Sequence, residues 1–268
     1  MGIRNRFRLD LALVHKLVGC IPPDEGVSTT HLRGQFPELG GEKVRGVREW
    51  ADDLGLTCQR DQQTFLSPLG EAALLTRNSP HETKIQEIMY YKLATNEDLE
   101  VFGALVNDFL FDVVRTFEQS FGLEEARRRI PELVKTDANP RYVRGEVSTA
   151  LNALTNEQGV SKLDIVVLTG RDRYRVNSYR PDWRSAAYII HDSWPENVSR
   201  VHISEVVGDR NGLGRIFFLT EPQVMALLSK LEQERAIALE MVADLTQIGP
   251  NPSMKAEDFL EMLVHDQS

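Results

Sequence analysis

One pattern occurs three times along this chain: short helical segments that end at glycine or proline are followed by two short extended segments around a turn. It is clearest between residues 123 and 182. There, Pro140 suits the first turn of a helix, and the apolar residues after it recur at helical spacing. Strand-favouring residues then flank a glycine turn, which predicts a hairpin. The expected elements are helices over 123–134 and 140–155 and strands over 162–168 and 173–177 around a turn at 169–172.

Residues 1–80 show the same order of elements. Ser28 and the two threonines after it can cap a short helix, which Pro37 stops. In the next helix, the apolar residues recur at spacings of three and four and form one stripe. Three helices followed by a hairpin indicate a winged helix. The expected helices cover 9–18, 28–36 and 42–54, and the hairpin strands cover 56–60 and 64–67.

The third occurrence, over residues 183–250, is the weakest. Its last helix carries Glu221, Glu232 and Glu234, which match a phosphate backbone poorly. We therefore interpret this segment as a docking or dimer unit rather than a DNA reader. The expected helices cover 183–194, 203–207 and 221–234, with a strand over 215–219 and a strand pair over 237–248.

These patterns predict a mainly α fold with short β-hairpins, built from tandem winged helix-turn-helix modules joined by a helical connector. With 268 residues, of which 41% are hydrophobic, the chain can bury the cores of two ordinary domains or three small ones. The expected divisions are an N-terminal winged helix over 1–80, a helical connector over 81–122, a middle winged helix with a basic hairpin over 123–182, a C-terminal winged-helix-like docking module over 183–250 and a tail helix within 251–268.

The charge is unevenly distributed. The formal net charge is −9, which argues against a chain that coats nucleic acid along its whole length. Residues 138–180 nevertheless hold seven basic and four acidic residues, whereas residues 183–268 hold seven basic and thirteen acidic residues. A basic face is therefore expected in the middle module.

Side chains of this basic segment fall at positions suited to DNA. A helix in the major groove presents one face to base edges, where Arg pairs with guanine and Asn with adenine. Arginines on a neighbouring hairpin would contact phosphates or enter the minor groove. The candidate DNA-binding residues are Arg141, Arg144, Ser148 and Asn152 on helix 140–155, and Lys162, Arg171, Arg173 and Arg175 in the segment that forms the hairpin.

The first module offers a weaker set of basic residues. Lys43, Arg45 and Arg48 lie on helix 42–54 and are further candidates for DNA binding, but four acidic residues on the same helix offset them. A basic arm at the start of the chain is a further candidate, formed by Arg4, Arg6 and Arg8.

Catalytic and metal-binding patterns are not found. The six histidines are scattered without the spacing of a zinc site. The glycine-rich stretch over 208–215 lacks the Lys-Ser/Thr pair of a phosphate-binding loop and indicates a tight turn. We therefore expect no enzymatic activity, no catalytic residues, no metal and no cofactor.

The composition also bears on location. No apolar run approaches the roughly 18 residues of a membrane-spanning helix. Cys20 and Cys58 are too few for a disulfide framework. The sequence therefore predicts a cytoplasmic protein without a membrane partner.

Several short motifs resemble those of a winged-helix family of domains of unknown function, number four thousand and seven. That family shows glycine-lysine, apolar-Arg-x-Trp, Leu-Gly-Leu and Thr/Ser-Pro-Leu-Gly-Glu in this order. The matching segments here are residues 39–50, Leu54-Gly55-Leu56 and 66–71, and later residues 174–177, 214–219 and 243–248. The similarity spans most of the chain.

The resemblance implies a place in a prokaryotic defence system. Members of that family are encoded beside enzymes similar to phosphoadenosine-phosphosulfate reductase, in DNA phosphorothioation and other phage-defence clusters. It therefore implies an accessory protein of DNA modification, restriction or antiviral defence, whose partner is a DNA-modification enzyme, nuclease or ATPase of the same gene cluster.

Three functions remain open from the sequence. The first is a non-catalytic recognition or scaffold subunit that binds double-stranded DNA within such a protein complex. The second is a sequence-specific winged-helix transcriptional regulator, which predicts a symmetric dimer on one operator. The third is a protein-protein adaptor without DNA binding, which the acidic C-terminal third favours. Whether the chain forms a homo-oligomer stays open.

Overall fold

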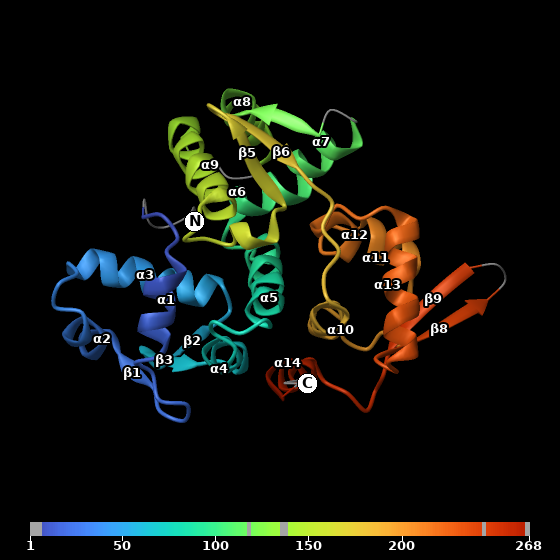
Figure 1. The fold of residues 1–268 in the computed structure, drawn as a ribbon, viewed down its shortest axis with the longest axis horizontal. Helices are drawn as coiled ribbons and strands as arrows, with labels where there is room; N and C mark the ends of the chain where they lie inside the picture. The colour runs from blue at the N-terminus through green and yellow to red at the C-terminus, as the bar shows by residue number, and fades with distance from the viewer. Residues whose placement is uncertain (1–6, 117–118, 135–138, 243–244, 266–268) are drawn as a thin grey trace.

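The computed structural model describes residues 7–116, 119–134, 139–242 and 245–265. Over these residues the protein is mainly helical, with three small antiparallel sheets of three strands each. The expectation of a mainly α chain with short β-hairpins is therefore confirmed. In Figure 1, three units of helices and a small sheet surround the helix α5 (Glu82–Thr95).

The first unit follows the expected elements closely. Ser28 begins its second helix by accepting a hydrogen bond from the backbone N–H of His31 at 3.1 Å, and Ser67 caps its last helix in the same way through Gly70 at 3.0 Å. The elements are α1 (Leu11–Val18), β1 (Val27–Ser28), α2 (Thr29–Gln35), α3 (Gly41–Asp53), β2 (Thr57–Arg60), β3 (Gln63–Leu66) and α4 (Pro68–Leu75).

The second unit differs from the expectation at its hairpin. The strand predicted over 162–168 begins only at Val166, because Asp164 has a left-handed backbone with φ 50°, which an extended strand cannot contain. A 3-10 turn precedes it. The elements are α6 (Glu100–Gly103), a π-helix η1 (Ala104–Leu110), α7 (Phe111–Arg115), β4 (Ser120–Gly122), α8 (Leu123–Leu133), α9 (Pro140–Thr155), η2 (Ser161–Leu163), β5 (Val166–Gly170) and β6 (Arg173–Val176).

The third unit corrects one predicted strand. Residues 215–219 form no strand, and a helical turn, α12, ends within that range instead. A Cβ atom on Gly214 would lie 2.4 Å from the carbonyl oxygen of Val207, so this glycine allows the turn to pack directly on the preceding helix. The elements are α10 (Trp183–Asp192), β7 (Val201–His202), α11 (Ile203–Gly208), α12 (Leu213–Ile216), α13 (Glu221–Gln233), β8 (Ile237–Val242), β9 (Leu245–Pro250) and the final helix α14 (Ala256–His265).

The three sheets share one topology. Their strand orders are β1-β3-β2, β4-β6-β5 and β7-β9-β8, so the last strand of each unit lies in the middle of its sheet. Around each sheet the chain runs in the order helix, strand, two or more helices, strand, strand. The first strand of each sheet has only two or three residues and was not expected from the sequence.

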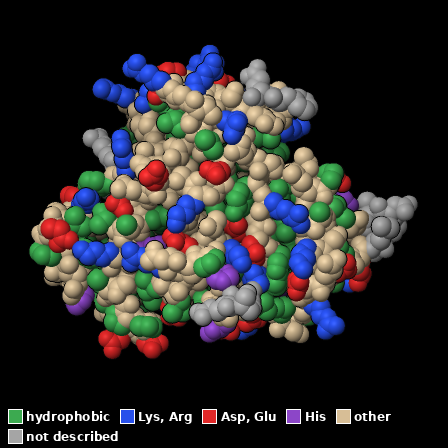
Figure 2. Space-filling view, viewed as in Figure 1, with side chains coloured by type: hydrophobic (Ala, Val, Ile, Leu, Met, Phe, Trp, Pro, Cys, Tyr) green, Lys and Arg blue, Asp and Glu red, His purple; other side chains and the backbone are tan. Residues whose placement is uncertain are grey.

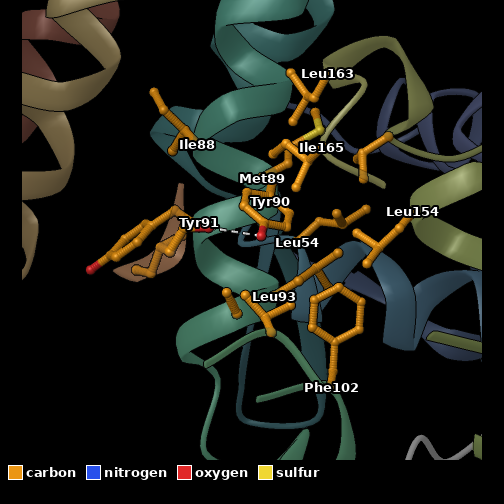
Figure 3. Packing of buried hydrophobic residues seen from close by; sticks show 14 of the residues in the cluster. Leu54, Ile88, Met89, Tyr90, Tyr91, Leu93, Phe102, Leu154, Leu163 and Ile165 are labelled. Atoms are coloured by element: carbon orange, nitrogen blue, oxygen red, sulfur yellow. Dashed lines mark hydrogen bonds between the residues drawn. The ribbon is translucent and has the colours of Figure 1, made fainter. Parts of the chain in front are cut away.

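The helix α5 connects the three units. Its side chains pack against Leu54 of the first unit and against Phe102, Leu154 and Leu163 of the second, as Figure 3 shows. Toward the third unit, the Tyr90 hydroxyl donates a hydrogen bond to the carbonyl oxygen of Ile216 at 2.9 Å. The final helix α14 packs on both α10 and α4, so the end of the described chain contacts its first third.

Candidate nucleic-acid interface

The central strand of the second sheet presents arginines on its outer face. Along β6, Tyr174 and Val176 are buried, whereas Arg173 and Arg175 are exposed. This alternation follows from the pleat, which turns successive side chains to opposite faces. Beneath β6, the Tyr174 ring stacks on Phe121 at a centroid distance of 5.3 Å, and burial raises the pKa of its hydroxyl. The buried ring fixes the strand and therefore the direction of both arginines.

The turn of this hairpin adds a third arginine. Arg171 is exposed at the tip beside Asp172, whose backbone adopts φ 55°. The carbonyl oxygen of Asp172 accepts a hydrogen bond from the N–H of Leu123 at 2.9 Å, where α8 begins. The tip is therefore attached to α8, and the predicted arginines of the hairpin lie beside the helices of the same unit.

The first half of α9 is the exposed half. Asn139 accepts a hydrogen bond from the N–H of Arg141 at 2.9 Å and caps the helix. Arg141 and Arg144 are exposed, and Tyr142 between them has 44% of its surface exposed. On the opposite face Glu146 is buried, and this burial raises the pKa of its carboxyl group to about 7.

The second half of the predicted DNA-binding face of α9 is partly covered by other residues. The Ser148 hydroxyl accepts hydrogen bonds from Nε and Nη2 of Arg127 on α8, at 3.2 and 2.8 Å. Asn152 is half-buried, and its side-chain oxygen has no contact with solvent. The predicted set therefore divides: Arg141 and Arg144 are exposed, whereas Ser148 contacts the neighbouring helix and Asn152 is half-buried.

Two arginines of α8 join this surface and were not expected from the sequence. Arg128 is exposed, and Arg127 lines a shallow hollow together with Arg144. The run Arg127-Arg128-Arg129 was the available signal, but it lies outside the segment counted as basic. Two acidic residues of α8 pair with arginines of the same helix, Glu124 with Arg127 at 2.7 Å and Glu125 with Arg129 at 3.7 Å.

The exposed arginines of this unit have no acidic partner among the described residues. Figure 2 shows Lys and Arg side chains gathered at the top of the molecule, where Figure 1 places α8, α9 and the β5–β6 hairpin. We call this surface the arginine face. Its members without an ion pair to any described residue are Arg128, Arg141, Arg144, Arg171, Arg173 and Arg175.

Lys162 does not belong to the arginine face. Its ammonium group lies 3.1 Å from the carboxylate of Glu82, at the start of α5. The 3-10 turn before β5 directs this residue toward the first unit. There, burial lowers the pKa of the His15 imidazole, and the nearby positive charges of Arg77 and Lys162 lower it further. The structure therefore pairs Lys162 with Glu82 and does not group it with the arginines of the hairpin.

In the first unit, two of the three candidate side chains already have partners within the protein. Arg45 pairs with Glu42 and, at 3.8 Å, with Glu49. Arg48 donates to the Thr29 hydroxyl at 3.1 Å and to Gln59 at 3.3 Å.

The other basic candidates of this unit are less engaged or lie beyond the description. Lys43 is exposed beside a hollow that Arg8 also lines. Arg4 and Arg6 of the expected basic arm lie outside the described residues. Among the described candidates, the first unit therefore offers fewer basic side chains without a partner than the arginine face does.

In the third unit, the exposed side of α13 is acidic. Glu221, Glu232 and Glu234 are all exposed, and Lys230 is paired with Glu234. Between α10 and α11 lies a mainly apolar hollow lined by Ile190, Trp194, Val206 and Leu213 among others. The exposed side of α13 therefore carries acidic residues where α9 of the second unit carries arginines.

Among the residues that the structure describes, no three His, Cys, Asp or Glu side chains gather as metal ligands. Within the same ranges, no helix has both the length and the apolar character to cross a bilayer.

Comparison with known proteins gives a fold relationship. The crystal structure of SspB superposes with a TM-score of 0.72 at 12% sequence identity, covering 98% of this chain and 86% of SspB. A magnesium-ion-bound crystal structure of SspB superposes with a TM-score of 0.72 at 13% identity and the same coverage. No family model matches the sequence, and no curated protein matches it. This chain therefore shares its fold with SspB.

Proposed function

We propose that each of the three units is a winged helix. Each unit has the same order of helices and strands, with the last strand in the middle of a three-stranded antiparallel sheet. In this interpretation α3, α9 and α13 are the third helices, and the β2–β3, β5–β6 and β8–β9 hairpins are the wings.

We propose that the protein is a non-catalytic, DNA-binding recognition or scaffold subunit. One observation carries this proposal: six arginines of the arginine face lack an acidic partner among the described residues, in a protein of net charge −9. Unpaired guanidinium groups on one face attract a polyanion, and each phosphate contact releases a counterion. In this arrangement, the first half of α9 enters the major groove and the β5–β6 hairpin contacts the adjacent backbone or minor groove.

The biological setting that we propose is prokaryotic DNA modification or antiphage defence. It is supported by the motif resemblance of residues 39–50 and 66–71 to the family described above. The partner would be a DNA-modification enzyme, nuclease or ATPase of the same gene cluster, and the acidic third unit is the surface that we propose for it. Phosphorothioated DNA is the modified substrate to compare with unmodified DNA.

The hairpin arginines provide the direct test. We expect the Arg171→Ala/Arg173→Ala/Arg175→Ala variant to bind random duplex DNA more weakly than the wild type. The slope of log affinity against log salt should become less negative by about 2.7, because each lost phosphate contact removes about 0.9. The measurement is a fluorescence titration of a labelled duplex from about 50 to 200 mM salt, where such slopes are resolved.

A matched variant in the first unit serves as control. Lys43→Ala/Arg45→Ala/Arg48→Ala removes the same number of positive charges, but two of its side chains already have intramolecular partners. We expect this variant to change the affinity and the salt slope less than the hairpin variant does. Equal effects of the two variants would contradict the assignment of the arginine face, and absence of wild-type binding at the lowest salt would contradict DNA binding altogether.

A second candidate function is that of a protein-protein adaptor. The apolar hollow beside Trp194, rimmed by Glu205 and Asp209, favours this role for the third unit. An adaptor would co-purify with its enzyme after nuclease treatment and would not bind the labelled duplex. A symmetric footprint on one palindromic site would instead support a transcriptional regulator.

A further inference from the structure

A glycine lies in the middle of the exposed face of α9. Gly145 is the sixth residue of this helix, where glycine is less favourable than alanine. A Cβ atom built on Gly145 would meet no described atom within 4 Å. Packing within the described protein would therefore tolerate a side chain here and does not explain the glycine.

Several other glycines of the chain have an evident structural reason. A Cβ atom on Gly70 would lie 2.1 Å from the carbonyl oxygen of Leu56, and one on Gly159 would lie 2.1 Å from that of Ala153. Gly55 adopts φ 74°, which side chains disfavour. Gly145 has neither a close neighbour nor a positive φ, so it has no such reason within the described structure.

The surroundings of Gly145 leave the helix backbone accessible. Thr149, one turn later, donates its hydroxyl to the carbonyl oxygen of Gly145 at 3.4 Å, and Ser148 donates to that of Arg144 at 3.3 Å. Both hydroxyls are thus directed back to the helix. Toward the start of the helix, the exposed side chains of Arg141, one turn earlier, and Arg144, the preceding residue, lie beside the bare position.

We propose that Gly145 is the point of closest approach between α9 and bound DNA. This inference rests on the proposed function and specifies the position of the duplex on α9. With no side chain at this position, the helix backbone can approach the groove closely while Arg141 and Arg144, which precede it on the helix, reach past it toward the DNA. The partner is double-stranded DNA because the arginines around the glycine have no acidic partner among the described residues.

Gly145→Ala and Gly145→Leu test this proposal. Both residues favour a helix more than glycine does, so both variants should melt about 2–4 °C above the wild type. Both should nevertheless bind a labelled random duplex more weakly, and the leucine variant by at least about tenfold because its larger side chain blocks the approach. A higher melting temperature with weaker binding cannot result from misfolding.

Gly34 provides the matched control. It lies on the exposed face of α2 in the first unit, and a Cβ atom there would also meet no described atom within 4 Å. Gly34→Leu should leave the affinity for the same duplex unchanged. If the wild type binds DNA and Gly145→Leu binds equally well, the close approach at Gly145 is refuted while DNA binding stands. If the wild type does not bind, the proposed function itself is refuted.

Discussion

The side chain of Glu87 is a carboxyl group buried in the interior of the protein. Its oxygens accept hydrogen bonds from the Tyr179 hydroxyl at 2.6 Å and from the N–H of Asp182 at 3.0 Å, so it joins α5 to the segment before α10. Only 3% of its surface is exposed. Burial is the largest influence and raises the pKa of this carboxyl group to about 7, despite the hydrogen bonds that favour its charged form.

This raised pKa predicts a pH-dependent stability. Between pH 4.5 and 7 the folded state binds more protons at Glu87 than the unfolded state, so the free energy of unfolding decreases as the pH rises through this range. Glu87→Gln keeps the shape of the protonated group and should reduce that decrease by as much as about 3 kcal/mol. Urea unfolding at pH 5 and pH 8 measures it. An unchanged difference between the two pH values would refute the assignment, and Glu97→Gln at an exposed position is the control.

At the level of single residues, the candidate site was predictable only in part. Arg173 and Arg175 were identified correctly as exposed because strand alternation alone determines their direction. Ser148 and Lys162 were expected on the DNA-facing surface, yet each has a partner from another element, Arg127 of α8 and Glu82 of α5. Helical spacing describes one helix and contains no information about which neighbour covers it.

At the level of elements, the π-helix η1 joins the second and third units. Arg215 donates to the carbonyl oxygen of Asn107 at 2.5 Å and to that of Gly208 at 3.3 Å, and it pairs with Asp108 at 3.1 Å. Its guanidinium group also lies over the Phe111 ring at 4.7 Å. A π-helix frequently marks a functional position, and here it holds the arginine of α12.

We expect Arg215→Ala to destabilise the protein by about 2–3 kcal/mol, because it removes several hydrogen bonds of a charged group. Arg215→Lys should recover only part of this loss, since an ammonium group cannot reproduce the planar fork. Arg210→Ala is the control, because Arg210 is more exposed and reaches Asp108 only at 3.4 Å, so its loss should cost less than about 1 kcal/mol. Urea unfolding of the three variants measures these values, and equal losses for Arg215→Ala and Arg210→Ala would contradict the interpretation.

Elements with terminal signals were predicted well, and elements without them were not. The helices α2 and α9 begin where Ser28 and Pro140 indicated. The short strands β1, β4 and β7 contain too few residues to show a period of two. The apolar run that ends at Leu219 is buried, and such a run does not distinguish a strand from a buried helical turn.

At the level of the whole molecule, the final helix connects distant parts of the chain. α14 packs on α10 and α4, and Phe259 on it is fully buried with its ring 5.0 Å from that of His191. We expect Phe259→Ala to cost about 3–5 kcal/mol of stability, the usual result of removing a buried aromatic ring. Met262→Ala, on the exposed side of the same helix, should cost much less. Thermal and urea unfolding measure both, and a small loss for Phe259→Ala would show that α14 contributes little to stability.

The position of α14 also has a consequence for the order of synthesis. The ribosome completes α4 about 180 residues before it reaches α14. At a synthesis rate of about 5–20 residues per second, roughly 10–40 s pass between the synthesis of α4 and that of α14, which covers it in the finished protein. During this interval the nascent chain exposes an apolar surface, which makes it a candidate client for chaperones.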